Sequence, residues 1–406
     1  MRVNCCIAGG GPAGVMLGLL LARAGVDVLV LEKHADFLRD FRGDTVHPST
    51  LEVMRELGLL EDFLRRPHQE LREIAGEIAG RRIVIADLRH LPTACKFVAL
   101  MPQWDFLDFL VEHARAYPTF RLMMQAEVTG LLQENDRVAG VEATTPGGRL
   151  EIRSNLVVGA DGRHSIVRER ARLVVESLGA PIDVLWMRLP RRPDDPGPTL
   201  GYVAGNSILV MLDRGDYWQC GFVIPKGAFD AIRAAGIEAF RARIAAVVPF
   251  VRDRVGELKD WDAVKLLTVL VDRLREWCRP GLLCIGDAAH AMSPVGGIGI
   301  NLAIQDAVAT ANILAVPLRQ GRAGLDDLRA VQRRREFPTR MTQRLQVFIH
   351  NHVLSRALAQ TPSELPLALR LVQRFPVVRR IPARIVGVGF RPEHVKSPNL
   401  DAGRRV

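Results

Sequence analysis

The sequence predicts an α/β protein with a Rossmann-like domain, a second domain rich in β-sheet, and helices at the C-terminal end. Two glycine signatures carry most of this prediction, one at residues 9–14 and one at residues 286–290. A third observation is that residues 172–271 contain longer and less regular β segments, interrupted by a helical run over 228–245. Although the two glycine signatures lie far apart in the chain, we expect both to contact one nucleotide.

The first signature lies between two apolar strands. Residues 3–8 form a short apolar run, Gly9-Gly10-Gly11-Pro12-Ala13-Gly14 follows, and a helical run leads to a second strand over 27–31. In such a βαβ unit Gly9 permits the tight turn, Gly11 lets a pyrophosphate approach, and Gly14 lets the helix pack on the strand. Glu32 ends the second strand, where a carboxylate binds a ribose 2′-hydroxyl. The pattern therefore indicates FAD or NAD.

The segments that follow continue the α/β pattern. We expect a polar loop over 41–48, a helix over 49–57, a hairpin over 70–91, a strand over 97–101, a helix from 103 to about 116, and a β-meander over 120–158. The meander ends in an apolar strand that delivers Asp161 at its carboxyl end.

The second glycine signature follows a strand that stops at an acidic turn. Gly286-Asp287-Ala288-Ala289-His290 comes first, and a glycine-rich stretch then opens a helix near Gly299. A carboxylate at a strand end can bind a polyol, and a helix N-terminus favours negative charge on a planar ring lying against it. Reduced flavin carries such a charge, whereas nicotinamide would gain nothing from this arrangement. The nucleotide is therefore expected to be FAD.

Composition is that of a conventional two-domain protein. The chain has 406 residues, of which 48% are hydrophobic and 25% are charged. Its six cysteines show no paired metal spacing, so we expect reduced core residues and no metal site. No apolar stretch approaches the ~18 residues that span a bilayer. These features predict a cytoplasmic protein.

Positive charge is concentrated at the C-terminal end. Residues 318–406 hold 18 Lys and Arg against 6 Asp and Glu, whereas residues 1–317 hold 37 against 39. Apolar residues interleave with the arginines, which favours helices docked on protein and leaves contact with a membrane surface open. The sequence has no recognisable nucleic-acid-binding motif, so we expect no nucleic acid partner.

The motifs as a set resemble those of the class A FAD-dependent monooxygenases, the para-hydroxybenzoate hydroxylase-like family that includes the ubiquinone-biosynthesis hydroxylases. The shared motifs are the first glycine signature, Gly159-Ala160-Asp161-Gly162 with Arg163 to Arg168, and the second signature with Pro294 and Gly297-x-Gly299-x-Asn301. Many relatives have Gln where this chain has Ile298. The resemblance covers nearly the whole chain.

The resemblance implies domains, cofactors and an activity. It implies an FAD-binding domain over 1–171 and 275–335, a substrate domain over 172–274 to which residues 70–95 contribute a hairpin, and a basic helical region over 336–406. It implies that NADH or NADPH reduces bound FAD and that O2 then forms a flavin C4a-hydroperoxide, which hydroxylates an aromatic small molecule. The substrate would be phenolic, quinone-like or polycyclic, and the protein a monomer or homodimer.

The resemblance also names site residues. The cofactor-binding residues that it implies are Gly9, Gly11, Pro12, Ala13, Gly14, Glu32, Lys33, Arg42, Gln103, Asp161, Gly286, Asp287, Pro294, Gly297, Ile298, Gly299, Ile300 and Asn301. Residues that could line a substrate cavity are Met211, Tyr217, Trp218, Gln219, Phe222 and Val295, although each could equally be core. Catalytic candidates are His47 and Pro294; His47 could be a phenol base or a satisfied loop residue. His290 is expected to be structural.

Other functions fit parts of the pattern. A flavin halogenase would carry Trp-x-Trp-x-Ile-Pro, of which Tyr217-Trp218-Gln219-Cys220 and Ile224-Pro225 are a partial echo. A reductase or dehydrogenase of the geranylgeranyl reductase type would share both signatures but insert no oxygen. A flavin-binding regulator would show no substrate-stimulated oxidation of NAD(P)H.

Overall fold

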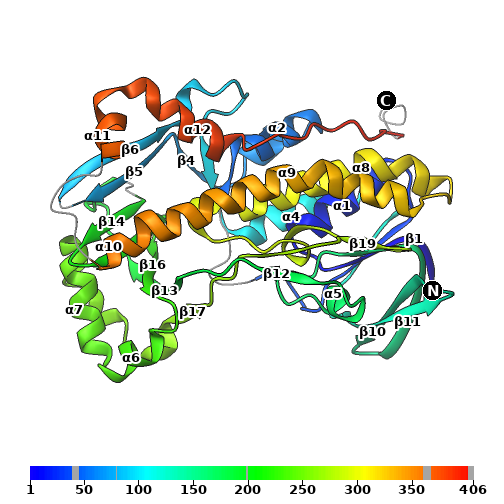
Figure 1. Ribbon diagram of the computed structural model, residues 1–406, viewed down its shortest axis with the longest axis horizontal. Coiled ribbons are helices and arrows are strands. Elements are labelled where there is room, and N and C mark those ends of the chain that lie inside the picture. Colours follow the sequence, from blue (N-terminus) through cyan, green and yellow to red (C-terminus); the bar gives the residue numbers. More distant parts are fainter. Residues whose placement is uncertain (39–44, 79, 198–199, 360–366, 401–406) are drawn as a thin grey trace.

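Two large β-sheets lie toward opposite ends of an elongated molecule, and one long helix runs beside both (Figure 1). The computed structural model describes residues 1–38, 45–78, 80–197, 200–359 and 367–400. The mixed α/β architecture, with C-terminal helices, is the one that the sequence predicts.

The eight-stranded sheet is built on a parallel core. Its main path is β19 (Cys278–Arg279), β20 (Leu282–Cys284), β11 (Gly148–Gly159), β1 (Arg2–Ala8), β2 (Val28–Leu31) and β8 (Phe120–Met123). The pairs β20–β11, β11–β1, β1–β2 and β2–β8 are parallel. All four residues of β2 are buried, as expected for a parallel strand covered on both faces.

The expected meander is present in part. β9 (Glu127–Glu134), β10 (Arg137–Thr145) and β11 are antiparallel neighbours. β8 instead pairs with β2 as a parallel strand. The reason is that β8 follows α4 (Gln103–Ala114), so the chain reaches the edge of this sheet through a helix and not through a hairpin.

A layer of apolar helices covers the parallel core. α1 (Pro12–Arg23) packs against both α4 and α8 (Gly299–Arg319), and α9 (Leu325–Ile349) packs on the outer side of α8 (Figure 1). The six cysteines are buried and unpaired. Burial raises the pKa of the Cys6 thiol to about 12.

One helix corrects the expectation that no apolar stretch is long enough to span a membrane. The segment Val295–Arg319 is long and apolar enough to cross a membrane, and its most apolar stretch of 18 residues has a mean hydropathy of 1.3. However, 72% of that stretch is buried inside the protein. Its apolar character is therefore explained by contact with α1 and α9 on both sides.

The seven-stranded sheet recruits a hairpin from the N-terminal part of the chain. Its order is β17 (Lys265–Leu267), β13 (Ile182–Pro190), β16 (Tyr217–Pro225), β15 (Ser207–Asp213), β14 (Gly201–Ala204), β5 (Glu73–Ile78) and β6 (Arg81–Asp87). The hairpin β5–β6 joins through a parallel pairing of β5 with β14. α6 (Phe229–Ala234) and α7 (Ile237–Val247) fall in the expected helical interruption.

Smaller elements connect the two sheets. β12 (Val175–Ser177) and β18 (Asp272–Leu274) form an antiparallel pair close to both ends of the expected substrate domain, whose boundaries stay a prediction. β3 (Thr45–Val46), β7 (Val98–Leu100) and β4 (Gln69–Leu71) form a three-stranded sheet. The remaining helices of this part are α2 (Pro48–Glu56), α3 (Leu60–Leu64) and α5 (Ile166–Arg170).

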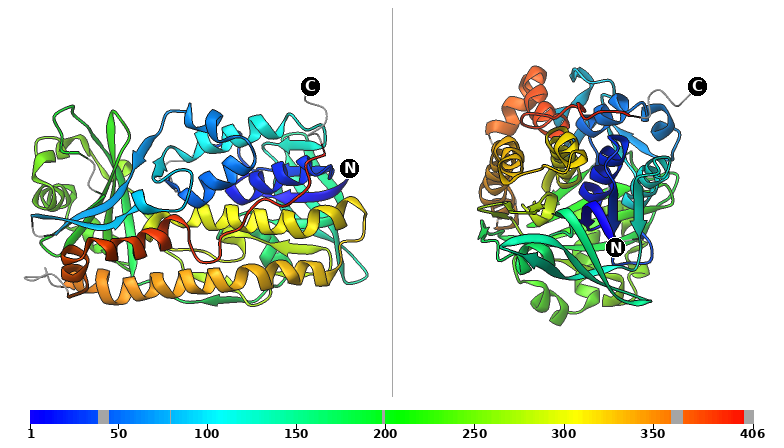
Figure 2. Two further views of the ribbon diagram at one scale, coloured as in Figure 1. Left: turned by 90° about the horizontal axis from the view of Figure 1, so that it is seen from above. Right: turned by 90° about the vertical axis from the view of Figure 1, so that its right-hand side faces the viewer.

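The C-terminal region folds back over both halves of the molecule. α9 passes into a π-helical turn, η7 (His350–Leu354), and then α10 (Ser355–Ala359). α11 (Leu367–Arg374), the 3-10 turn η8 (Pro376–Arg379) and α12 (Arg380–Gly387) pack on β6. The last described residues then run back along the helical layer (Figure 2), where the Asn312 side chain bonds the His394 carbonyl.

Candidate functional site

Three sequence motifs meet at the carboxyl edge of the eight-stranded sheet. β1, β11 and β20 are adjacent parallel strands whose last residues Ala8, Gly159 and Cys284 are in register. A Cβ atom on Gly9 would lie 2.3 Å from the Ala160 carbonyl oxygen, next to Asp161. The two glycine signatures are also in contact with each other, because a Cβ on Gly286 would lie 3.1 Å from the Cβ of Ala13.

The first glycine loop has the shape that a pyrophosphate requires. Gly9 has φ +108°, and a Cβ on Gly14 would lie 1.9 Å from the Gly9 carbonyl oxygen, so neither position tolerates a side chain. Around Gly11, in contrast, no atom lies within 4 Å of a Cβ position. α1 begins at Pro12 without a side-chain cap or an acid in its first turn. Its free N–H groups therefore suit a bound anion.

Glu32 links the end of β2 to this loop. Its Oε2 accepts a hydrogen bond from the Gly10 N–H at 2.9 Å, and its Oε1 accepts one from the His34 N–H at 3.1 Å. A carboxylate has about four acceptor positions, so it can hold Gly10 and also bind a ribose hydroxyl. Lys33 beside it is exposed.

Asp161 and Asp287 lie at the ends of neighbouring strands and have different roles. The Asp161 carboxylate accepts the Val167 N–H at 3.1 Å, at the start of α5. Burial raises the pKa of Asp161 against the opposing effect of hydrogen bonds from Ser165 and Val167. Asp287 is paired with Arg163, whose Nη2 lies 3.4 Å from Asp287 Oδ2.

Arg163 is a site residue that the sequence reading quoted only within a motif. Its other terminal nitrogen, Nη1, is buried and has no hydrogen-bond partner among the described residues. A buried guanidinium N–H without a partner is costly unless a further polar group satisfies it. The arrangement therefore fits a polar cofactor chain, such as the ribityl chain of FAD, held beside the pair of Asp287 and Arg163.

The loop before α8 is open and has positive φ at two glycines. Gly296 has φ +81° and Gly297 has φ +61°, and the Thr45 hydroxyl donates to the Gly297 carbonyl at 2.8 Å. No atom lies within 4 Å of a Cβ position on Gly299, and α8 begins there without a cap or an acid. This helix N-terminus can therefore favour negative charge on a ring beside it. Pro294, Val295 and Ile298 are partly exposed here, and Ile300 is buried.

Asn301 holds this loop in place. Its Oδ1 accepts hydrogen bonds from the His47 N–H at 2.8 Å and the Thr50 hydroxyl at 2.7 Å. Its Nδ2 donates to the carbonyls of Thr45 at 3.1 Å and Gly297 at 3.3 Å. Because its amide group is fully used within the protein, the side chain positions the loop and is not expected to bind the cofactor directly.

Polar residues on the buried side of α9 hold residues 291–295, the segment that precedes α8. These polar residues were not identified from the sequence. Gln343 Nε2 donates to the carbonyls of Asp272 at 2.7 Å and Ala291 at 3.2 Å. Gln346 accepts the Ser293 N–H at 3.1 Å and donates to the carbonyls of Ser293 and Val295, each at 3.0 Å. We call Gln343, Gln346 and His350 the glutamine–histidine clamp.

His350 completes the clamp from the π-helical turn. Its Nε2 lies 2.7 Å from the Ser293 hydroxyl oxygen, and both side chains are buried. Burial lowers the pKa of His350. The signal in the sequence is the spacing 343, 346 and 350, which places three polar residues on one side of a helix.

A buried ionic network lies beneath the second glycine signature. Asp306 accepts the Gly286 N–H at 3.0 Å, lies 2.6 Å from His290 Nε2, and pairs with Arg335 Nε at 2.9 Å. Burial alone would raise the pKa of Asp306, but His290 and Arg335 hold it below its ordinary value. His290 therefore supports the acidic turn, which agrees with the structural role expected for it.

His47 is buried in a neutral state. Its Nδ1 donates to the Val386 carbonyl oxygen at 2.8 Å, and burial lowers its pKa to about 4 despite that bond. A histidine with so low a pKa is a weak base near neutral pH. The structure therefore favours the alternative of a satisfied loop residue.

The proposed substrate residues divide between the two faces of the seven-stranded sheet. Met211, Trp218 and Phe222 are packed in a core that includes Phe240 and Ile244 of α7. This corrects the prediction that they line a cavity, because alternate residues of β16 point to opposite faces. Gln219 is buried on the other face, while Tyr217 lies 4.9 Å beneath the Arg188 guanidinium.

The face that carries Gln219 offers an aromatic surface that the sequence reading did not single out. Trp186 pairs with Gly221 across β13 and β16, and a Cβ on Gly221 would lie 3.1 Å from the indole ring. Trp186 is partly exposed and packs with residues of α10 and η7. The absence of a side chain at Gly221 therefore makes room for this ring.

Two further cofactor candidates are Arg42 and Gln103. Arg42 lies outside the described residues. Gln103 begins α4 and is partly buried.

Comparison with known proteins agrees with this site. Residues 2–345 match the family described as "FAD binding domain". The chain is 36% identical over 404 residues to 6-methylpretetramide 4-monooxygenase of Streptomyces rimosus, covering 99% of this chain and 96% of that protein. It is 30% identical to dialkyldecalin synthase of Streptomyces rugosporus, over 76% of this chain and 64% of that one.

The fold has close counterparts among solved structures. OxyS anhydrotetracycline hydroxylase from Streptomyces rimosus superposes with a TM-score of 0.74 at 24% identity, over 95% of this chain and 76% of that chain. The family match, the whole-length relative and the convergence of both glycine signatures lead to one conclusion. The chain belongs to the class A FAD-dependent aromatic monooxygenases, with FAD as its bound cofactor and NAD(P)H as co-substrate.

Proposed function

We propose that the protein hydroxylates a polycyclic phenol, and that 6-methylpretetramide or a close analogue is the first compound to test. The observation that carries this proposal is the likeness to 6-methylpretetramide 4-monooxygenase over almost the full length of both chains. That likeness includes the seven-stranded sheet, where relatives that differ in substrate would be expected to differ in sequence.

The residues of the chain would bind and orient the cofactor. FAD, when bound, supplies the redox chemistry between NAD(P)H and oxygen. Gly9, Gly11 and the N-terminus of α1 would bind its pyrophosphate, and Glu32 its adenosine ribose. Asp287 and Arg163 would hold the ribityl chain. The N-terminus of α8 would stabilise negative charge on the ring system.

The face of the seven-stranded sheet that carries Gln219 would orient the substrate. Trp186, Gly221 and Gln219 share that face, and an indole ring can stack on a flat aromatic substrate. Val295 and Pro294, which the clamp holds in place, would form the facing wall. The half-buried indole favours a flat, fused-ring substrate.

Four further assignments are part of the proposal. We place the enzyme in the cytoplasm, as a monomer or homodimer. We assign residues 1–171 and 275–335 to FAD and 172–274 to substrate, with residues 336–406 as a basic helical region. We also propose that the hairpin of residues 70–95 belongs to the substrate domain, because β5 pairs with β14.

The test is to measure NADH and NADPH consumption by the FAD-loaded protein under isotopic oxygen, with a panel that includes 6-methylpretetramide, simple phenols, quinols and indoles. We expect a polycyclic phenol to accelerate oxidation and to gain one labelled oxygen. Acceleration without label would mean that the compound is an effector or that the protein is a reductase. Hydroxylation of simple phenols alone would contradict the polycyclic assignment.

A Trp186→Leu variant tests the substrate face. We expect KM for the aromatic substrate to rise about tenfold, the loss of roughly one stacking contact, while FAD content is unchanged. The matched control is Trp261→Leu, a tryptophan packed beside α6 and α7 on the opposite face. An unchanged KM in Trp186→Leu would remove this residue from the substrate site.

A further inference from the structure

We infer that the outer surface of α11, η8 and α12 docks on an anionic phospholipid membrane. This surface, which we call the arginine–apolar patch, comprises residues 369–385. It lies on the outside of the hairpin β5–β6 (Figures 1 and 2).

The first observation is a group of large apolar side chains that point to solvent. Leu371, Phe375, Val377 and Ile381 are 46%, 53%, 66% and 61% exposed. They fall within eleven consecutive residues. Scattered apolar residues at a surface need no explanation, but a dense group of them commonly marks a binding surface.

The second observation is charge. Residues 367–391 contain six arginines and no aspartate or glutamate. The Arg379 guanidinium donates to the carbonyls of Val372 at 3.1 Å and Gln373 at 3.3 Å, so it joins η8 to the end of α11. The two short helices are thereby held together, with apolar and basic side chains on one outer surface.

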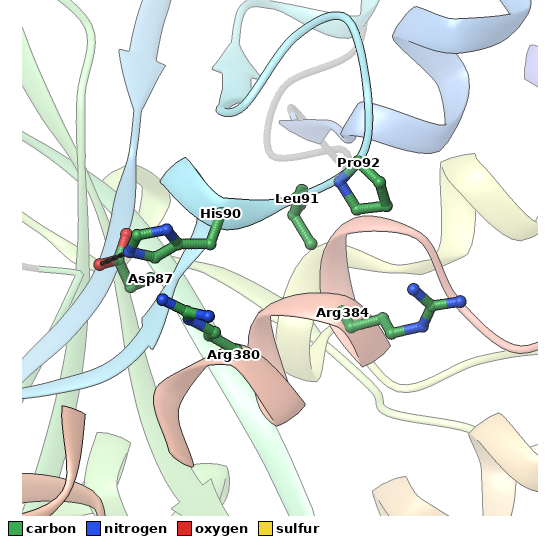
Figure 3. Close-up of a pocket in the computed structure, with 6 residues that line it drawn as sticks. All are labelled: Asp87, His90, Leu91, Pro92, Arg380 and Arg384. Atoms are coloured by element: carbon green, nitrogen blue, oxygen red, sulfur yellow. Dashed lines mark ion pairs between the residues drawn. The ribbon is translucent and has the colours of Figure 1, made fainter. Parts of the chain in front are cut away.

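The third observation is a basic pocket at the edge of the patch. A pocket of about 140 Å³ lies between α12 and the end of β6, lined by Asp87, His90, Leu91, Pro92, Arg380 and Arg384 (Figure 3). Asp87, the acid in this pocket, is already held by Arg89 at 2.9 Å. Arg380 and Arg384 are exposed and one helical turn apart on α12, and Leu91 and Pro92 lie on the segment across from this helix (Figure 3).

These observations favour a lipid surface over other occupants. A second copy of the chain would bring two arginine-rich surfaces together, which like-charge repulsion disfavours. Nucleic acid would not use three protruding aliphatic side chains, because it is bound through phosphates and stacked bases. Amphipathic helices at membranes combine basic residues with apolar side chains that enter the headgroup layer. A lipid phosphate would occupy the basic pocket.

The experiment is flotation of the full-length, FAD-loaded protein with vesicles of phosphatidylcholine alone or of phosphatidylcholine with phosphatidylglycerol. We expect binding to the anionic vesicles at least about tenfold tighter than to the neutral ones, and weaker binding at high salt. Val377→Ser with Ile381→Ser should reduce anionic binding about tenfold. Arg380→Gln with Arg384→Gln should reduce both the binding and its salt dependence.

The matched control is Val175→Ser with Leu266→Ser, which removes two exposed apolar side chains outside the patch. It should bind vesicles like the parent protein, and every variant should keep its FAD content and its NAD(P)H oxidation in solution. Absence of vesicle binding would overturn the inference. So would a dimer that Val377→Ser with Ile381→Ser dissociates, or loss of NADPH affinity in Arg380→Gln with Arg384→Gln while vesicle binding stays unchanged.

Discussion

His47 couples the stability of the protein to pH through its burial. Its pKa is lowered from 6.5 to about 4 in the folded protein, so the unfolded chain binds a proton that the folded chain does not. The contribution of His47 to the free energy of unfolding is therefore fully present above pH 6.5. It is lost as pH falls toward 4, and it amounts to at most about 3 kcal/mol.

We expect His47→Asn, which cannot titrate but can still donate to the Val386 carbonyl, to flatten this part of the stability profile. The measurement is the denaturant midpoint between pH 7 and pH 4.5. His352→Asn, at an exposed histidine of η7, should leave the slope as it is. An unaltered slope in His47→Asn would show that another group controls it.

Asp287 is the residue on which retention of FAD should depend most. Asp287→Ala removes the carboxylate that Arg163 orients, so we expect most of the FAD to be lost during gel filtration. The flavin-to-protein absorbance ratio measures this directly. Asp287→Asn, which keeps one acceptor oxygen, should retain more, and Asp262→Ala, at an exposed acid beside the other sheet, should retain all. Full flavin content in Asp287→Ala would refute the assignment.

At the scale of single residues, backbone requirements were easier to predict than side-chain contacts. The glycine at position 9 was predictable because a turn with positive φ excludes other residues. The roles of Asn301 and Arg163 were not, because their partners lie more than a hundred residues away in the sequence. Met211, Trp218 and Phe222 were misassigned because sequence does not say which face of a strand meets α7.

At the scale of elements, the hydrogen bonds of the glutamine–histidine clamp fix the segment that precedes α8 against α9. Gln346→Leu would leave the Ser293 N–H and two carbonyls without partners, each costing about 1–3 kcal/mol when buried. We therefore expect the segment to shift and hydroxylated product per NAD(P)H consumed to fall about tenfold. Product and NAD(P)H are measured together.

Arg344→Ala, at an exposed position of the same helix, is the control for Gln346→Leu. It should leave the yield per NAD(P)H unchanged. Equal yields in both variants and the parent would mean that the clamp serves stability alone.

The seven-stranded sheet depends on a buried ion pair beside Trp218. Asp195 accepts hydrogen bonds from Arg254 at 2.7 and 2.8 Å and from the Trp218 indole at 2.7 Å. Burial would raise the pKa of Asp195, but Arg254 and its other donors lower it to about 2. Asp195→Ala should cost about 3–5 kcal/mol of unfolding free energy, because the Arg254 charge would remain buried without a partner.

Denaturant unfolding at neutral pH checks this expectation. Glu134→Ala, at a solvent-exposed ion pair with Arg153, should cost less than about 1 kcal/mol. Similar losses in the two variants would contradict the importance of burial.

Elements were predictable where hydrophobic periodicity and turn residues agree. The first βαβ unit, the hairpin over 70–91 and the helix from Gly299 all form close to their expected bounds. The partner of β8 was not predictable from its own residues, because four apolar residues suit a parallel or an antiparallel neighbour equally.

At the scale of the whole molecule, the chain closes on itself around the cofactor edge. β20 and α8 from the second half complete the sheet and helical layer that β1 and α1 begin. The resemblance of the motifs indicated this closure, since both glycine signatures were expected at one nucleotide. The return of the last described residues over the helical layer carried no such signal.

The path of the C-terminal region has a practical consequence for anyone who divides this chain into parts. The family match ends at residue 345, inside α9, whereas Gln346, His350 and the Glu393 partner of Arg334 lie beyond it. A fragment cut at that boundary would end in mid-helix and remove the partners of Ser293 and Arg335. Expression trials for crystallography should therefore keep the chain at least to residue 400.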